Sequence, residues 1–283
     1  MRRSVEILAA AVVLLVNASP VMALIQFNDG GVWDIDYEIN DDVWVDYLRP
    51  GMQTTVNLLA GGSIIDFLPH EYNMLQAFED SRINIPGGLI TYLRAYDSSQ
   101  VNLSGGSISY CQAYGNQAFG NNRINISGGS INAHLEAFGN SQMSISGGSI
   151  NCLETFADSR VNISGGSFVN NSLYVYSNSE VDIFGGSFQR DLRVRDNGIL
   201  TIHGSDFAVD GTPFGYGELT SIFGGYWDNE PYRHLTGTLF SGESIANDFR
   251  IALDAKIVLV PEPATLLLLG LGGLALLRNR RSR

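Results

Sequence analysis

The sequence predicts an all-β fold: a parallel β-solenoid, expected to be a right-handed β-helix with coils of about 18–20 residues. Three observations predict it. Short segments alternate apolar and polar residues, as half-buried strands do. A second short segment with alternating apolar and polar residues, such as Leu153-Glu154-Thr155, follows in each unit. A Gly-Gly doublet recurs, mostly every 18 to 23 residues, starting at Gly61, Gly87, Gly105, Gly128, Gly147, Gly165 and Gly185, with a degenerate copy at Gly204.

One repeat shows what each unit builds. In Arg160–Phe168, apolar Val161 and Ile163 alternate with polar residues, which predicts a short strand with one buried face. Gly165-Gly166 then interrupts the strand, because glycine adopts backbone angles that other residues avoid. Such a unit cannot bury its own apolar face, whereas units stacked about 4.8 Å apart can.

Stacking in register predicts ladders of equivalent residues along the solenoid. The repeat lacks the longer leucine pattern of a leucine-rich horseshoe and the Gly-Gly-x-Gly-x-Asp of a calcium-binding β-roll. The expected inward ladders are Ile83/Val101/Ile124/Met143/Val161/Val181, Ile85/Leu103/Ile126/Ile145/Ile163/Ile183 and Leu75/Leu93/Cys111/Leu135/Leu153/Leu173/Leu192. An outward polar ladder is expected at Asn84, Asn102, Asn125, Ser144, Asn162, Asp182 and Thr201.

The N-terminal residues 1–23 predict an export signal. A basic start at Arg2 and Arg3 precedes the apolar run Ile7–Val16, and Val21-Met22-Ala23 fits cleavage after Ala23. The short apolar run favours a cleaved signal over a membrane anchor.

The rest of the chain divides by how regular the repeat is. We expect an N-terminal cap with one irregular coil at 24–55, regular coils at 56–207, and irregular last coils with a C-terminal cap at 208–260. The segment Gln112–Asn121 resembles a local duplication, which predicts a small surface loop.

Net charge and cysteine positions bear on which partners and which disulfides are expected. The 283-residue chain carries 29 Asp plus Glu against 17 Lys plus Arg, a formal net charge of −12, which disfavours nucleic acid as a partner. Cys111 falls on an inward ladder and Cys152 on an outward position two coils away. That separation predicts free thiols rather than a disulfide.

The C-terminal residues 261–283 carry the most specific motif. Pro261-Glu262-Pro263 precedes the apolar run Ala264–Leu277, and a basic cluster follows that includes Arg278, Arg280 and Arg281. This combination resembles the PEP-CTERM sorting signal of Gram-negative bacteria. The resemblance implies export through the Sec translocon, transient inner-membrane anchoring by a C-terminal membrane helix, and processing by an exosortase in an organism that makes exopolysaccharide. The alternative is a buried C-terminal helix.

Catalytic residues are not predicted. Parallel β-helices include polysaccharide lyases and hydrolases, which need converging carboxylates or a metal-bound acid cluster. Glu136 and Glu154 are expected side by side, yet a repeat that copies a glutamate gives the same result. His70, His134, His203 and His234 lack ligand spacing, so no metal or cofactor is predicted.

The candidate ligand-binding surface is an aromatic row, formed by Phe78, Tyr96, Tyr114, Phe138, Phe156 and Tyr176. Strict alternation places these rings outward, where they would bind extended sugar chains. The alternative tucks them into a corner of the core. The asparagine ladder has two interpretations as well: amides hydrogen-bonded along the axis, or a polar lattice for glycan or ice.

The sequence therefore predicts an exported, non-enzymatic cell-surface or matrix protein with a structural or adhesive role, contacting polysaccharide. The alternatives are a polysaccharide lyase or hydrolase on the same fold and, third, an ice-binding surface protein.

Overall fold

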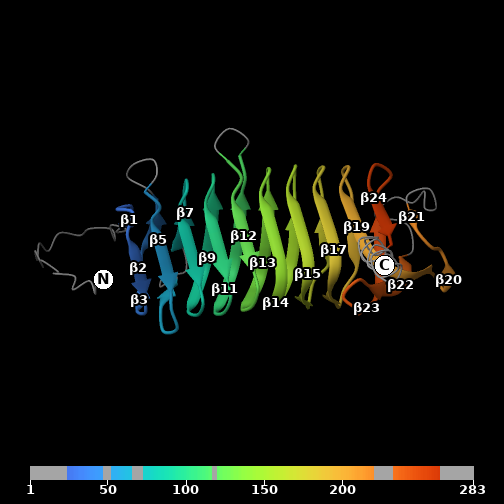
Figure 1. Cartoon of the computed structure of the whole chain (residues 1–283), viewed down its shortest axis with the longest axis horizontal. Helices are drawn as coiled ribbons and strands as arrows, with labels where there is room; N and C mark the ends of the chain where they lie inside the picture. Colours follow the sequence, from blue (N-terminus) through green and yellow to red (C-terminus); the bar gives the residue numbers. More distant parts are fainter. Residues whose placement is uncertain (1–23, 47–51, 66–72, 117–119, 220–231, 262–283) are drawn as a thin grey trace, which may run out of the picture.

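The computed structural model describes residues 24–46, 52–65, 73–116, 120–219 and 232–261. Within these ranges the regular secondary structure is all strand, and the strands stack side by side along one long axis (Figure 1). The predicted parallel β-solenoid is confirmed. No helix in the described ranges is long and apolar enough to cross a membrane. The expected membrane helix and the export signal both lie outside those ranges.

Each coil contributes strand segments to three faces, and each segment pairs in parallel with the coils before and after. The first face precedes the Gly-Gly doublet and holds β2 (Val32–Ile35), β5 (Thr55–Leu58), β8 (Arg82–Ile85), β10 (Gln100–Leu103), β12 (Arg123–Ile126) and the starts of β14 (Gln142–Thr155), β15 (Arg160–Phe168), β17 (Glu180–Phe188) and β19 (Ile199–Val209). The second face follows the doublet and holds β3 (Glu38–Ile39), β6 (Ser63–Ile64) and the starts of β9 (Leu89–Tyr96), β11 (Ser107–Tyr114) and β13 (Ser130–Phe138), with later parts of β14, β15 and β17.

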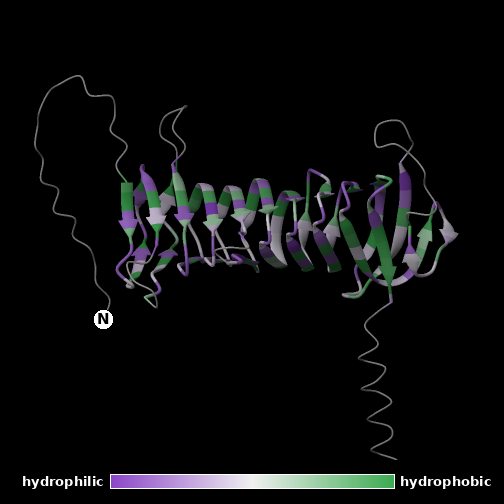
Figure 2. Ribbon diagram, turned by 90° about the horizontal axis from the view of Figure 1, so that it is seen from above, coloured by the Kyte–Doolittle hydropathy of each residue, from purple (hydrophilic) through white to green (hydrophobic). Residues whose placement is uncertain are grey.

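The third face carries the aromatic row, and we call it the aromatic face. It holds β1 (Leu24–Phe27), β4 (Asp42–Val45), β7 (Met74–Ala77), the ends of β9, β11, β13 and β14, then β16 (Leu173–Val175) and β18 (Leu192–Val194). Apolar and polar residues alternate along the strands over the length of the solenoid (Figure 2).

The three inward ladders form as predicted. Val101 pairs with Ile83 and Ile124, Leu103 pairs with Ile85 and Ile126, and the leucine ladder continues through Cys111. These residues are at most 3% exposed and belong to one continuous apolar core. The core therefore runs along the axis, and each coil buries its apolar side chains against its neighbours.

The outward asparagine ladder hydrogen-bonds along the axis over part of its length. The side-chain Nδ2 of Asn84, Asn102 and Asn125 each donates to Oδ1 of the residue one coil earlier, at 2.8, 2.9 and 2.8 Å. Asn57 extends the chain of bonds to Asp34. The axial amide interpretation is confirmed for these coils, and the bonds stop where Ser144 replaces asparagine.

From the second doublet onward, the second glycine of the doublet has a positive φ and forms a tight corner between the first and second faces. Gly106 has a φ of 73°, in the left-handed region that favours glycine. A Cβ there would lie 2.5 Å from the carbonyl oxygen of Gly87 in the previous coil. Stacking of corners thus requires a residue without a side chain.

The N-terminal stretch 24–55 contributes strands that stack in register with later coils. β1 pairs in parallel with β4, and β4 with β7. Further along, the chain leaves the coil after β11 and closes a loop through an antiparallel bridge between Asn116 and Gly120. This loop lies where the duplicated segment predicts one.

The C-terminal end changes strand direction. β24 (Lys256–Val260) stacks in parallel on β19, whereas β22 (Arg233–Leu239) and β23 (Ser244–Ile251) form an antiparallel hairpin, with β22 antiparallel to β19. Two short strands, β20 (Thr212–Pro213) and β21 (Gly217–Glu218), also pair antiparallel, with β19 and β24. The change of direction ends the repeating stack.

Candidate functional site

The aromatic row forms a continuous stack on the outer side of the aromatic face. The inward neighbours of its rings, such as Ala77 and Ala137, are fully buried, while the rings from Phe78 to Phe156 are half-buried and Tyr176 is 8% exposed. The rings from Phe78 to Phe156 are thus partly accessible to solvent, whereas Tyr176 at the end of the row is buried.

The rings contact one another face to face. Neighbouring centroids from Phe78 to Phe156 are 4.9–5.2 Å apart with interplanar angles of 4–11°. Tyr176 is tilted by 43° at the end of the row, and the Arg195 guanidinium lies 4.3 Å from its ring centroid. Since ring faces cover ring faces, the row presents mainly edges to a ligand.

A polar row runs beside the aromatic row on the same strands. Arg94 Nε donates to Gln112 Oε1 at 2.8 Å, and Gln112 Nε2 donates to Glu136 Oε2 at 2.6 Å. Glu136 pairs in register with Glu154 on the next coil, as predicted. Two carboxylates therefore lie next to each other on an outer surface, beside stacked rings.

A third column on this face brings together residues that the sequence analysis kept apart. His134 pairs in register with Cys152, and its Nδ1 lies 3.2 Å from Glu154 Oε1. The Cys152 Sγ is 3.5 Å from the same oxygen. The repeat register alone could have predicted this pairing. Leu135 and Leu153 are ladder partners, and His134 and Cys152 immediately precede them in sequence.

Both cysteines are free and buried. Cys152, expected at an outward position, is only 1% exposed, because its thiol lies against Glu154 and near the carbonyl oxygen of Ser172. Burial, reinforced by the negative charge of Glu136, raises the pKa of Cys111 to about 12. Burial and then the Glu154 carboxylate raise the pKa of Cys152 to about 12. Both thiols are therefore protonated at neutral pH.

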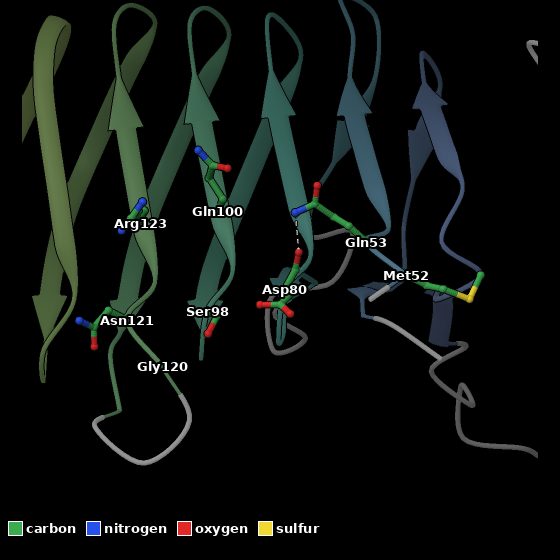
Figure 3. Close-up of a pocket in the computed structure, with 8 residues that line it drawn as sticks. All are labelled: Met52, Gln53, Asp80, Ser98, Gln100, Gly120, Asn121 and Arg123. Atoms are coloured by element: carbon green, nitrogen blue, oxygen red, sulfur yellow. Dashed lines mark hydrogen bonds between the residues drawn. The ribbon is translucent and has the colours of Figure 1, made fainter. Parts of the chain in front are cut away.

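A polar hollow of about 740 Å³ lies where the chain turns from the aromatic face to the first face (Figure 3). Asp80 and Ser98 enter it two residues after Phe78 and Tyr96 of the aromatic row. Gln53 Nε2 donates to the backbone carbonyl oxygen of Asp80 at 2.8 Å. The described lining residues are Met52, Gln53, Asp80, Ser98, Gln100, Gly120, Asn121 and Arg123.

The sorting residues lie mostly outside the described ranges. Pro261 is exposed and directly follows β24, the last strand. Glu262, Pro263, Arg278, Arg280, Arg281 and the cleavage residue Ala23 are not among the described residues. His70 is not either, whereas His203 and His234 pair with separate carboxylates, Asp182 and Asp248.

Comparison with known proteins identifies the class through the tail. A family model described as the PEP-CTERM protein-sorting motif matches residues 259–281. The protein is thus a β-solenoid with a PEP-CTERM sorting signal. The motif is a recognition signal for exosortase, and it marks an exported, surface- and exopolysaccharide-associated protein that is anchored in the membrane by its C-terminus before processing. No curated protein and no solved structure matches the chain.

Proposed function

We propose that this protein is a non-enzymatic component of the cell surface or extracellular matrix, with a structural and adhesive role, that binds exopolysaccharide directly. The sorting motif supports delivery to the surface by an exosortase. The regular stack supports the structural role, because it repeats outward side chains about every 4.8 Å along a straight rod. After processing, the solenoid resides at the cell surface, the outer membrane or the matrix.

The observation that carries direct binding is the polar hollow beside the aromatic row. Its amide, hydroxyl, guanidinium and carboxylate groups are of the kinds that hydrogen-bond sugar hydroxyls. Gln100 and Arg123 occupy the same ladder position on adjacent coils, so they would contact successive parts of an extended chain. Tyr96 of the aromatic row lies two residues before Ser98, which lines the hollow. Because the ring faces are already stacked, we assign recognition to the hollow and a supporting role to the row.

Variants of the hollow test this assignment. In glycan-array and polysaccharide pull-down assays, the full chain purified in detergent should bind, and Gln100→Ala/Arg123→Ala should lose binding while keeping its circular dichroism spectrum. The matched control is Gln142→Ala/Arg160→Ala, which removes the same residue types from the same ladder outside the hollow. This control should bind normally. Equal binding by both variants would contradict the assignment.

The aromatic row is tested separately with Phe138→Ala/Phe156→Ala/Tyr176→Ala. We expect this variant to lose stability, since it removes the stacked rings of Phe138 and Phe156 and the buried ring of Tyr176. A folded variant that no longer binds polysaccharide would instead assign recognition to the row.

A lyase or hydrolase is the second candidate, favoured by the adjacent carboxylates Glu136 and Glu154. The same incubations would reveal it as shortened polysaccharide chains that Glu136→Gln no longer produces. Intact chains after prolonged incubation would support the non-enzymatic role.

A further inference from the structure

Three side chains of metal-ligand type converge at the border of the second and aromatic faces. His134 comes from β13, and Cys152 and Glu154 come from β14 in the next coil. The imidazole nitrogen, the thiol sulfur and a carboxylate oxygen all lie within 4.8 Å of one another. Two adjacent coils thus supply one nitrogen, one sulfur and one oxygen donor at a single point.

The two separations that involve Glu154 match those of ligands on one tetrahedral ion. Zinc bonds of about 2.0–2.1 Å to nitrogen and oxygen and about 2.3 Å to sulfur place tetrahedral ligands roughly 3.3 Å (N···O) and 3.5 Å (S···O) apart. The observed distances to Glu154 Oε1 are 3.2 Å from His134 Nδ1 and 3.5 Å from Cys152 Sγ. A cation would therefore bind with only small side-chain rotations.

The surroundings hold the ligands in place and favour positive charge. The His134 ring extends a column of stacked rings: Tyr92 and Tyr110 lie 4.7 Å apart, and Tyr110 and His134 lie 5.8 Å apart with an interplanar angle of 6°. Cys152 is fixed by burial. Glu136 stands beside Glu154 in register, so a cation would relieve the repulsion of two neighbouring carboxylates.

We propose that His134, Cys152 and Glu154 bind a divalent transition-metal cation, with Zn²⁺ as the best match and water in the fourth position. A mixed donor set with a thiolate and an imidazole suits zinc, whereas Ca²⁺ and Mg²⁺ require oxygen ligands. This site is separate from the polar hollow and does not depend on polysaccharide binding.

Cobalt titration tests the proposal, because Co²⁺ replaces Zn²⁺ in such sites and a cobalt–thiolate bond gives a near-ultraviolet charge-transfer band. The full chain, purified in detergent with a non-thiol reductant, should develop this band at one equivalent of Co²⁺ and lose it when Zn²⁺ is added. Cys152→Ala should show no band. Cys111→Ala is the matched control, since it removes the other buried thiol, and it should keep the band.

Glu154→Gln keeps the thiol and nearly the same shape, so it tests the site even if Cys152→Ala fails to fold. Loss of a direct ligand should weaken Co²⁺ and Zn²⁺ binding by at least about tenfold. Absence of a band in the unmodified chain, or an unchanged band in Cys152→Ala, would overturn the proposal and leave a hydrogen-bonded cluster. Unchanged affinity in Glu154→Gln would remove the carboxylate from the site.

Discussion

At the scale of single residues, Gly106, the second glycine of its doublet, is constrained both by its backbone angle and by its neighbours in the previous coil. Gly106 needs a positive φ, and it also touches the carbonyl oxygens of Gly87 and Gly88 one coil earlier, which would lie 2.5 and 2.7 Å from an added Cβ. Gly211 also has a positive φ, of 77°, yet nothing lies within 4 Å of its Cβ position. Comparing alanine substitutions at the two positions therefore distinguishes the cost of backbone strain from the cost of a steric clash.

Gly106→Ala should therefore destabilise the protein more than Gly211→Ala. Gly211→Ala is left with backbone strain alone, on the order of 1 kcal/mol. Gly106→Ala adds a clash with backbone atoms that cannot rotate away. Its loss of folding stability should therefore be clearly larger than that of Gly211→Ala. Urea denaturation of both variants measures the difference, and equal losses would show that the coils move apart to accept the methyl group.

At the residue scale, the sequence predicts some features of the candidate sites and not others. The ladder position of every ring in the aromatic row follows from alternation. Its stacking, which covers the ring faces, depends on side-chain rotamers that alternation does not specify. Linear motif spacing does not bring His134, Cys152 and Glu154 together, because residues on stacked coils are close in space but about one repeat apart in sequence.

At the scale of elements, the asparagine ladder shows how a polar outward row contributes to stacking. Asn102 donates to Asn84 and accepts from Asn125, so its side chain links three coils. Asn162 has the same ladder position, but it lies between Ser144 and Asp182 and is exposed. Within the described structure its side chain makes no hydrogen bond.

Asn102→Ala should lower the free energy of unfolding by about 1–3 kcal/mol. It removes two amide hydrogen bonds and leaves Asn84 Oδ1 and Asn125 Nδ2 without these partners. Asn162→Ala should change stability by less than about 0.5 kcal/mol. Thermal or urea unfolding of the two variants measures the contrast. A matching loss at both positions would mean that the ladder contributes through strand propensity rather than through its bonds.

Sequence periodicity predicted the strands of the coils well, because burial requires the same inward residues in every repeat. It carries less information about the C-terminal end of the solenoid. At the C-terminal end, the segments around Leu235 and Ile257 alternate like any coil, yet β22 runs antiparallel to β19 while β24 runs parallel to it. Alternation reports which face is buried and carries no information on strand direction.

At the scale of the whole molecule, the solenoid resembles a one-dimensional array in which each coil contacts mainly its neighbours. Leu135 lies at the centre of the stack on β13, and Leu259 lies on β24 at its C-terminal end. Both side chains are at most 1% exposed. Truncating each leucine therefore removes the same kind of buried contact from two different places in the array.

Leu135→Ala and Leu259→Ala should each lower the stability of the surrounding coils by about 2–5 kcal/mol. The two variants should differ in how far along the solenoid this destabilisation extends. The stability of a stacked-repeat protein is close to the sum of the stability of each repeat and of its interfaces with adjacent repeats. A defect in the last coil should therefore destabilise that end and leave distant coils unchanged. Hydrogen-exchange mass spectrometry should show faster exchange in β19 and β24 for Leu259→Ala, with β8 to β15 unchanged. Leu135→Ala should instead raise exchange in β11 to β15, on both sides of the defect. Uniform acceleration in both variants would show that the solenoid unfolds as one cooperative unit, and the coils could then not be treated as separable.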